Sequence, residues 1–137
     1  MITFFDTNIF IYAIDDSENI KRVKSMARIE QARSQGKVAL STQVLHEFYN
    51  ISRRKLRPPL SHSQAAQAVT HLCEFLVLGS MAASVQAALL LHEQHQLSWW
   101  DALILETALR SDADVLVSED FQHGRRFGKL VVENPFL

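Results

Sequence analysis

The first fourteen residues, MITFFDTNIFIYAI (residues 1–14), contain a single carboxylate, Asp6, between two apolar runs. Residues 2–5 have the length and the aromatic and β-branched composition of a buried strand. A carboxylate inside a core is costly unless it is paired or binds a cation. Asp6 therefore either caps a helix that starts near Asn8 or lies close to other polar groups, and the rest of the chain must distinguish the two.

Length and composition limit the class of protein. A chain of 137 residues is long enough for a sizeable core and predicts one domain, 1–137. Hydrophobic residues make up 47% and charged residues 21%, as in ordinary globular proteins. Every apolar run is interrupted well before ~20 residues, and no basic residue precedes Lys21, so neither a membrane span nor a signal peptide is predicted. The single cysteine, Cys73, excludes an internal disulfide and fits a cytoplasmic protein.

Short apolar segments alternate with longer segments of helical periodicity. Strands are predicted at 2–5, 38–40, 75–78, 115–117 and 130–132. Helices are predicted at 20–34, 43–55, 61–72, 81–95 and 98–111, with capping boxes at Ser61 and Gln64 and at Ser98 and Asp101. The alternation favours an α/β domain whose parallel sheet has helices on both faces. Such sheets bind ligands at the carboxyl ends of their strands, so the residues that follow strands are candidate site residues.

Four acids occupy positions where acids are not expected. Asp6 follows the first strand, and Asp120 follows the strand 115–117 in the stretch VLVSEDF. Glu47 borders the apolar side of the helix 43–55, and Asp101 shares the apolar side of the helix 98–111, from which Glu106 points away. Amphipathic helices normally keep carboxylates off this side, so these positions need an explanation.

Each of these acids also has an ordinary structural explanation. Asp6 could cap a helix, Asp101 could favour the dipole of a helix capped by Ser98, Asp120 could belong to a turn, and Glu47 could extend to solvent. Taken together, four such coincidences at strand ends and core-facing helix positions favour one shared acidic site. Four carboxylates in one place require a cation, and all-oxygen ligands suit Mg²⁺ or Mn²⁺ rather than zinc. Such ions in carboxylate sites support phosphodiester cleavage.

Basic residues are clustered although the net charge is −1. One cluster ends the helix that carries Glu47, and a second follows Asp120. The residues of these clusters that could hold the phosphates of a nucleic acid are Arg53, Arg54, Lys55 and Arg57, and then Arg125 and Arg126. Solvated helix faces and loops remain the alternative for each cluster.

The motifs together resemble the PIN-domain ribonucleases over essentially the whole chain. They are Asp6-Thr7-Asn8 after the first strand, Glu47 in the helix after the second, Asp101 opening a late helix, and Ser118-Glu119-Asp120 after the fourth strand. Within that family the sequence is most similar to the VapC-type toxins of toxin–antitoxin modules. The resemblance implies a five-stranded parallel sheet in the order 3-2-1-4-5 and metal-dependent cleavage of RNA with Mg²⁺ or Mn²⁺.

The resemblance also implies roles for individual residues. Asp6, Asp101 and Asp120 would surround one metal ion, and Glu47 would complete the site or hold a second ion. Asn8 and Ser118 match small polar supporting positions, and Glu119 would be left exposed. The family further implies a cognate antitoxin and commonly a homodimer, for which the Ala-rich helices 61–72 and 81–95 could supply the interface. No membrane partner is implied.

Other enzymes built on similar sheets fit these residues less well. A haloacid-dehalogenase-type phosphatase requires an Asp two positions after the first, where this chain has Asn8. A receiver domain requires an Asp after its third strand, where this chain has Leu78-Gly79-Ser80, and a dinucleotide enzyme requires a glycine-rich first turn. A catalytically inactive module that binds RNA or a protein remains the alternative to the ribonuclease.

Overall fold

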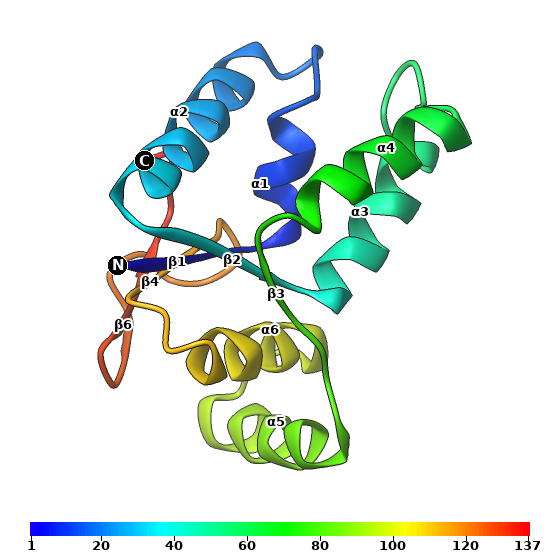
Figure 1. The fold of residues 1–137 in the computed structure, drawn as a ribbon. Helices are drawn as coiled ribbons and strands as arrows, with labels where there is room; N and C mark the ends of the chain where they lie inside the picture. The colour runs from blue at the N-terminus through cyan, green and yellow to red at the C-terminus, as the bar shows by residue number, and fades with distance from the viewer.

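The computed structural model describes residues 1–137 as a central sheet between two layers of helices (Figure 1). Helices α1 to α4 cover one face of the sheet, and α5 and α6 cover the other. In chain order the elements are β1 (Ile2–Phe5), α1 (Thr7–Tyr12), α2 (Asn19–Gln35), β2 (Lys37–Ser41), α3 (Thr42–Arg54), α4 (His62–Leu72), β3 (Leu76–Leu78), α5 (Ala82–His95), α6 (Trp99–Arg110), β4 (Val115–Val117), β5 (Arg126–Phe127) and β6 (Leu130–Glu133). The predicted α/β class is confirmed.

The sheet has six strands in the order β3-β2-β1-β4-β6-β5. The first five run parallel and follow the predicted order, with β6 as the fifth strand expected from the sequence. The prediction of a five-stranded, wholly parallel sheet is wrong at one edge, where β5 pairs antiparallel with β6. Two residues are too few to show any periodicity, so β5 is not detectable as a strand in the sequence.

Helix boundaries agree with the predicted ranges to within one or two residues, and the short helix α1 follows Asp6 directly. The capping box of Ser61 and Gln64 is present at the start of α4. At the start of α6 only half of the predicted box forms. The Ser98 hydroxyl accepts a hydrogen bond from the backbone N–H of Asp101 at 3.1 Å, but the Asp101 carboxylate returns none to the Ser98 backbone. The capping explanation for the Asp101 side chain is therefore weakened.

The core lies on both faces of the three central strands. Phe4, Phe5, Leu40 and Leu116 are fully buried, as expected for strands covered by helices on both sides. Burying each such side chain contributes about 1.5–3 kcal/mol to the stability of the fold, and this packing fixes the positions of the strand ends. None of the helices is both long and apolar enough to span a membrane.

Candidate metal centre

Three of the four singled-out acids converge at the carboxyl edge of the sheet. β1 and β4 are adjacent and parallel, with Phe5 paired to Val117, so the residues that follow them emerge side by side. The first turn of α6 brings Asp101 to the same edge. Carboxylate oxygens of Asp6, Asp101 and Asp120 all lie within 4.8 Å of one another. We call these three residues the acid cluster.

Asp6 both caps a helix and lies close to other polar groups, the two alternatives that the sequence left open. Its Oδ1 accepts a hydrogen bond from the backbone N–H of Thr7 at 2.8 Å, which caps α1. Its Oδ2 accepts from the Ser118 hydroxyl at 2.8 Å, and the side chain also belongs to the acid cluster. With only 6% of the residue exposed, Asp6 is a buried carboxylate whose hydrogen-bond donors are both neutral.

Ser118 links two members of the acid cluster. It is fully buried, donates its hydroxyl proton to Asp6, and accepts a hydrogen bond from the backbone N–H of Asp120 at 3.1 Å. This single side chain orients the Asp6 carboxylate and positions the backbone from which Asp120 extends. The structure thus places Ser118, a predicted supporting residue, in direct contact with the cluster.

The electrostatics of the acid cluster favour a bound cation. Burial raises the pKa of Asp6 to about 7, against the opposing hydrogen bonds from Ser118 and Thr7, and repulsion from Asp120 and Glu47 adds to the rise. Partial burial also raises the pKa of Asp101, and partial burial together with repulsion from Asp101 raises that of Asp120. No ion pair in the structure includes a member of the cluster. Binding of a proton or a cation would relieve this negative charge.

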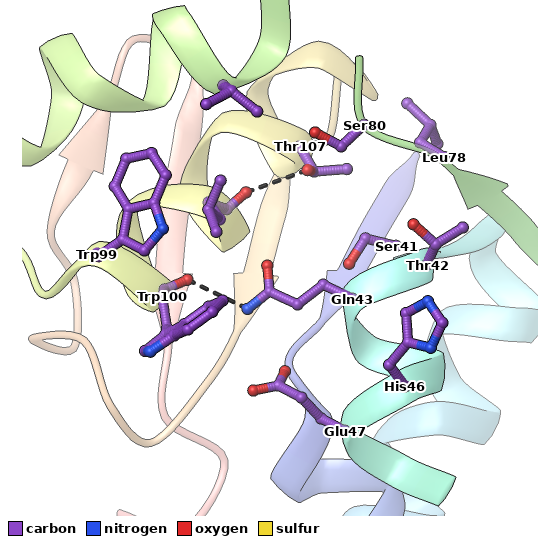
Figure 2. A pocket seen from close by; sticks show the side chains of 12 residues that line it. Ser41, Thr42, Gln43, His46, Glu47, Leu78, Ser80, Trp99, Trp100 and Thr107 are labelled. Carbon is purple, nitrogen blue, oxygen red and sulfur yellow. Dashed lines mark hydrogen bonds between the residues drawn. The ribbon is translucent and has the colours of Figure 1, made fainter. Parts of the chain in front are cut away.

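Glu47 lies beside the acid cluster rather than within it. The hydroxyl of Thr7 donates to its Oε1 at 2.8 Å, and its charge contributes to the raised pKa of Asp6 and Asp120. It is absent from the set of carboxylates within 4.8 Å of one another, and it lines a groove next to them (Figure 2). Thr7 received no role from the sequence, although its place in the Asp-Thr-Asn motif was the available signal.

The prediction that Glu119 is exposed is wrong. Its side chain is only 20% exposed, because Lys21 pairs with it at 3.1 Å and the Tyr12 hydroxyl donates to it at 2.6 Å. Asn8 also donates to Glu119, at 3.4 Å, and makes no hydrogen bond to the acid cluster. Asp120, by contrast, is exposed. Lys21 and Tyr12 hold Glu119 against α1 and α2, and this arrangement leaves Asp120 free to join the cluster.

Glu106 also differs from its prediction. The helical pattern of α6 pointed it away from the core, yet only 6% of the residue is exposed. α5 packs along α6 and covers this side, and Arg110 pairs with Glu106 at 2.9 Å. Arg110 also donates to the backbone oxygen of Gly79 at 2.7 Å. The carboxylate is therefore neutralised within the protein, unlike those of the acid cluster.

The predicted RNA-binding residues lie away from the acid cluster. Arg53, Arg54, Lys55 and Arg57, which we call the α3 basic group, are all exposed at the end of α3. Glu47 and Arg53 are six residues apart on α3, or ~9 Å along the helix axis. Arg125 lies over the ring of Phe127 at 4.7 Å. Arg126 pairs with Val131, and Val131 pairs with Val115, the first residue of β4. The acid cluster lies beyond the last residues of β1 and β4. Arg126 therefore lies toward the opposite end of the sheet.

The fold and the site define an α/β protein with an acidic centre at the carboxyl ends of β1 and β4. The family model described as PIN domain matches residues 3–127, and the chain therefore belongs to the PIN domain family. A comparison with curated protein sequences gives no significant match.

Solved structures share this fold over most of their length. VapBC2 from Rickettsia felis, bound to a DNA fragment from its promoter, is similar at 24% identity, with 98% of each chain covered and a TM-score of 0.66. A toxin–antitoxin complex from Klebsiella pneumoniae is similar at 20% identity, with 97% of each chain covered and a TM-score of 0.68. VapC20 from Mycobacterium tuberculosis, a toxin that cleaves the sarcin–ricin loop, is similar at 16% identity, with 83% of this chain and 86% of that chain covered and a TM-score of 0.58.

Proposed function

We propose that this protein is a divalent-metal-dependent ribonuclease and the toxin of a type II toxin–antitoxin pair. The observation that carries the proposal is the acid cluster. Its three carboxylates lie within 4.8 Å of one another and have no cationic side chain as a partner. The similar structures support the biological role, because they include toxin–antitoxin complexes and a toxin that cleaves RNA.

The residues of the cluster fit a hard divalent cation. Asp6, Asp101 and Asp120 offer only oxygen donors, and their mutual repulsion is relieved by a doubly charged ion, which favours Mg²⁺ or Mn²⁺. We assign these three residues as the metal-holding and catalytic residues, with Glu47 completing the site or holding a second ion. Such ions activate water and stabilise the charge on a phosphodiester during hydrolysis.

The surrounding residues of this chain hold the carboxylates in place. Ser118 donates a hydrogen bond to one oxygen of Asp6 and so fixes the orientation of this carboxylate relative to those of Asp101 and Asp120. Thr7 does the same for Glu47 from the first turn of α1. The buried position of Asp6 excludes water from one side of the site, which strengthens every charge interaction there. The α3 basic group is the first candidate to hold the flanking phosphates of RNA.

The proposed partners are an RNA substrate, a cognate antitoxin and a second copy of the chain, with the cytoplasm as the site of action. Exposed apolar side chains on α5 and at its N-cap support the homodimer. They are Met81, Val85, Leu89 and Leu90. Large apolar side chains left exposed in one helix are more typical of an interface than of a solvated helix.

The experiment is cleavage of a defined single-stranded RNA by highly purified protein. Wild type should cleave in Mg²⁺ or Mn²⁺, lose activity in EDTA, and recover when the ion is restored. Asp101→Asn should lower the rate at least ~100-fold because it removes a ligand charge while preserving shape. Asp16→Asn, which neutralises an exposed acid in the loop between α1 and α2, is the matched control and should cleave normally.

Two results would contradict the proposal. Full cleavage in chelator would point to a metal-free ribonuclease with a different site. A pure wild-type protein that binds RNA or an antitoxin but cleaves nothing would establish the alternative, a catalytically inactive PIN-like module.

A further inference from the structure

A groove of about 560 Å³ adjoins the acid cluster between α3, β3, α5 and α6 (Figure 2). Glu47 lines the groove and accepts a hydrogen bond at 2.8 Å from Thr7, the neighbour of Asp6. Trp100, which also lines the groove, directly precedes Asp101, so the groove adjoins the acid cluster. The volume falls within the roughly 300–1,000 Å³ that is typical of small-molecule sites. Apart from Glu47, none of the groove residues has a role predicted from the sequence.

The two tryptophans of the groove differ in what they contact. Trp99 is half-buried and packs edge-on against His92 with the ring centroids 5.9 Å apart, so its ring serves as a wall. Trp100 is 63% exposed and directly precedes Asp101 in the chain. Its backbone oxygen accepts a hydrogen bond from the side-chain amide of Gln43 at 3.3 Å, which ties the start of α6 to α3. Figure 2 shows Trp100 and Glu47 pointing into the same space from opposite sides.

The groove suits a neutral planar ring. No Lys or Arg lines it, and its one carboxylate, Glu47, would repel a phosphate. Hydroxyl and amide groups do line it, and they can donate to and accept from the edge of a heterocyclic base. They belong to Ser41, Thr42, Gln43, Ser80 and Thr107. An exposed indole face next to such groups is the combination with which proteins bind single-stranded nucleic acid bases.

We propose that this groove binds one nucleobase of the RNA next to the cleaved phosphodiester, stacked on the ring of Trp100. The inference rests on the proposed ribonuclease function and names the part of the substrate that the groove recognises. The adjacent phosphate then lies toward the acid cluster on the other side of Glu47. Trp100 is a binding residue in this arrangement, because it touches a base and not the reacting atoms.

The test is a cycle that combines a protein change with a substrate change. The substrate is a single-stranded RNA that wild type cleaves at one mapped bond, together with copies that carry one abasic nucleotide on either side of that bond. At one position the abasic change should lower the wild-type kcat/KM by about 5- to 100-fold, the usual effect of losing one stacked base. Trp100→Ala should lower kcat/KM on intact RNA by a similar factor, and the two changes together should cause no further loss.

Two control variants keep the cycle interpretable. Trp100→Phe retains an aromatic face and should keep most of the wild-type rate, which excludes a general folding defect. Ile20→Ala removes an exposed apolar side chain of α2, outside the groove, and should behave as wild type on every substrate.

The outcomes separate this inference from the proposed function. A wild-type protein that cleaves no RNA in Mg²⁺ or Mn²⁺ overturns both. If wild type cleaves RNA but the Trp100→Ala and abasic effects multiply independently, or no abasic position matters, only the base-binding groove is overturned. A Trp100→Ala variant that cleaves RNA normally but no longer binds the antitoxin would assign the groove to the protein partner instead.

Discussion

Replacing Asp6 by Asn should stabilise the metal-free protein, and increasingly so as the pH rises. Burial raises the pKa of Asp6 from 3.8 to about 7 in the folded protein. Below pH ~4 the carboxyl is protonated in both states and contributes nothing. Between pH ~4 and ~7 the unfolded chain releases this proton while the folded protein retains it, so rising pH favours unfolding. Above pH ~7 the full cost of the buried charge is present.

The magnitude follows from the size of the shift. A difference of about 3 pKa units corresponds to ~4 kcal/mol of lost stability at pH 8, of which ~2–3 kcal/mol is lost between pH 5 and pH 8. Asn avoids this cost and can still form a hydrogen bond at both positions, although the direction of the one with Ser118 is reversed. Its side-chain oxygen accepts from the Thr7 N–H, and its amide donates to the Ser118 hydroxyl. Asn is also a favourable residue at a helix N-terminus.

The assay is urea unfolding of wild type and Asp6→Asn in EDTA at pH 5 and pH 8. The stability advantage of Asp6→Asn should grow by ~2–3 kcal/mol between the two pH values, or roughly 1–2 M in the urea midpoint. Comparing the two proteins at each pH removes the contribution of the titrating groups that do not interact with Asp6. Added Mg²⁺ at pH 8 should stabilise wild type more than the variant. A difference between the two proteins that does not change with pH would refute the reasoning.

Two further predictions concern the support of the site and the RNA path. Ser118→Ala removes the hydrogen bond that lowers the pKa of Asp6, so Mg²⁺ affinity, measured by calorimetry, should fall by ~10–100-fold. The pH at which Mg²⁺ affinity reaches half of its maximum should also rise, and an unchanged value would contradict this prediction. Changing Arg53, Arg54 and Lys55 together to Ala should weaken RNA binding by the Asp101→Asn protein and reduce the slope of log affinity against log salt by ~2, as measured by fluorescence anisotropy. An unchanged slope would move the RNA path toward Arg125 and Arg126.

Much of the fold and part of the site could be predicted from local sequence. The periodicity of apolar residues distinguishes strands from helices, and it located five strands and five of the helices. Asp6 and Asp120 could be placed at one edge because residues after parallel strands emerge on the same side of a sheet. The convergence of Asp6, Asp101 and Asp120 was accordingly predicted, although their role in binding a metal stays a proposal.

What the sequence could not determine depends on contacts between residues far apart in the chain. Glu119 and Asp120 are neighbours with the same charge. Only contacts with Tyr12 and Lys21, about a hundred residues earlier, make Glu119 the less exposed of the two. Glu106 is buried because α5 packs over it, which the periodicity of α6 alone does not indicate. Side-chain contacts of this kind depend on how whole helices and strands pack against one another. The position of Glu47 beside the acid cluster, held by Thr7 across forty residues, was decided in the same way.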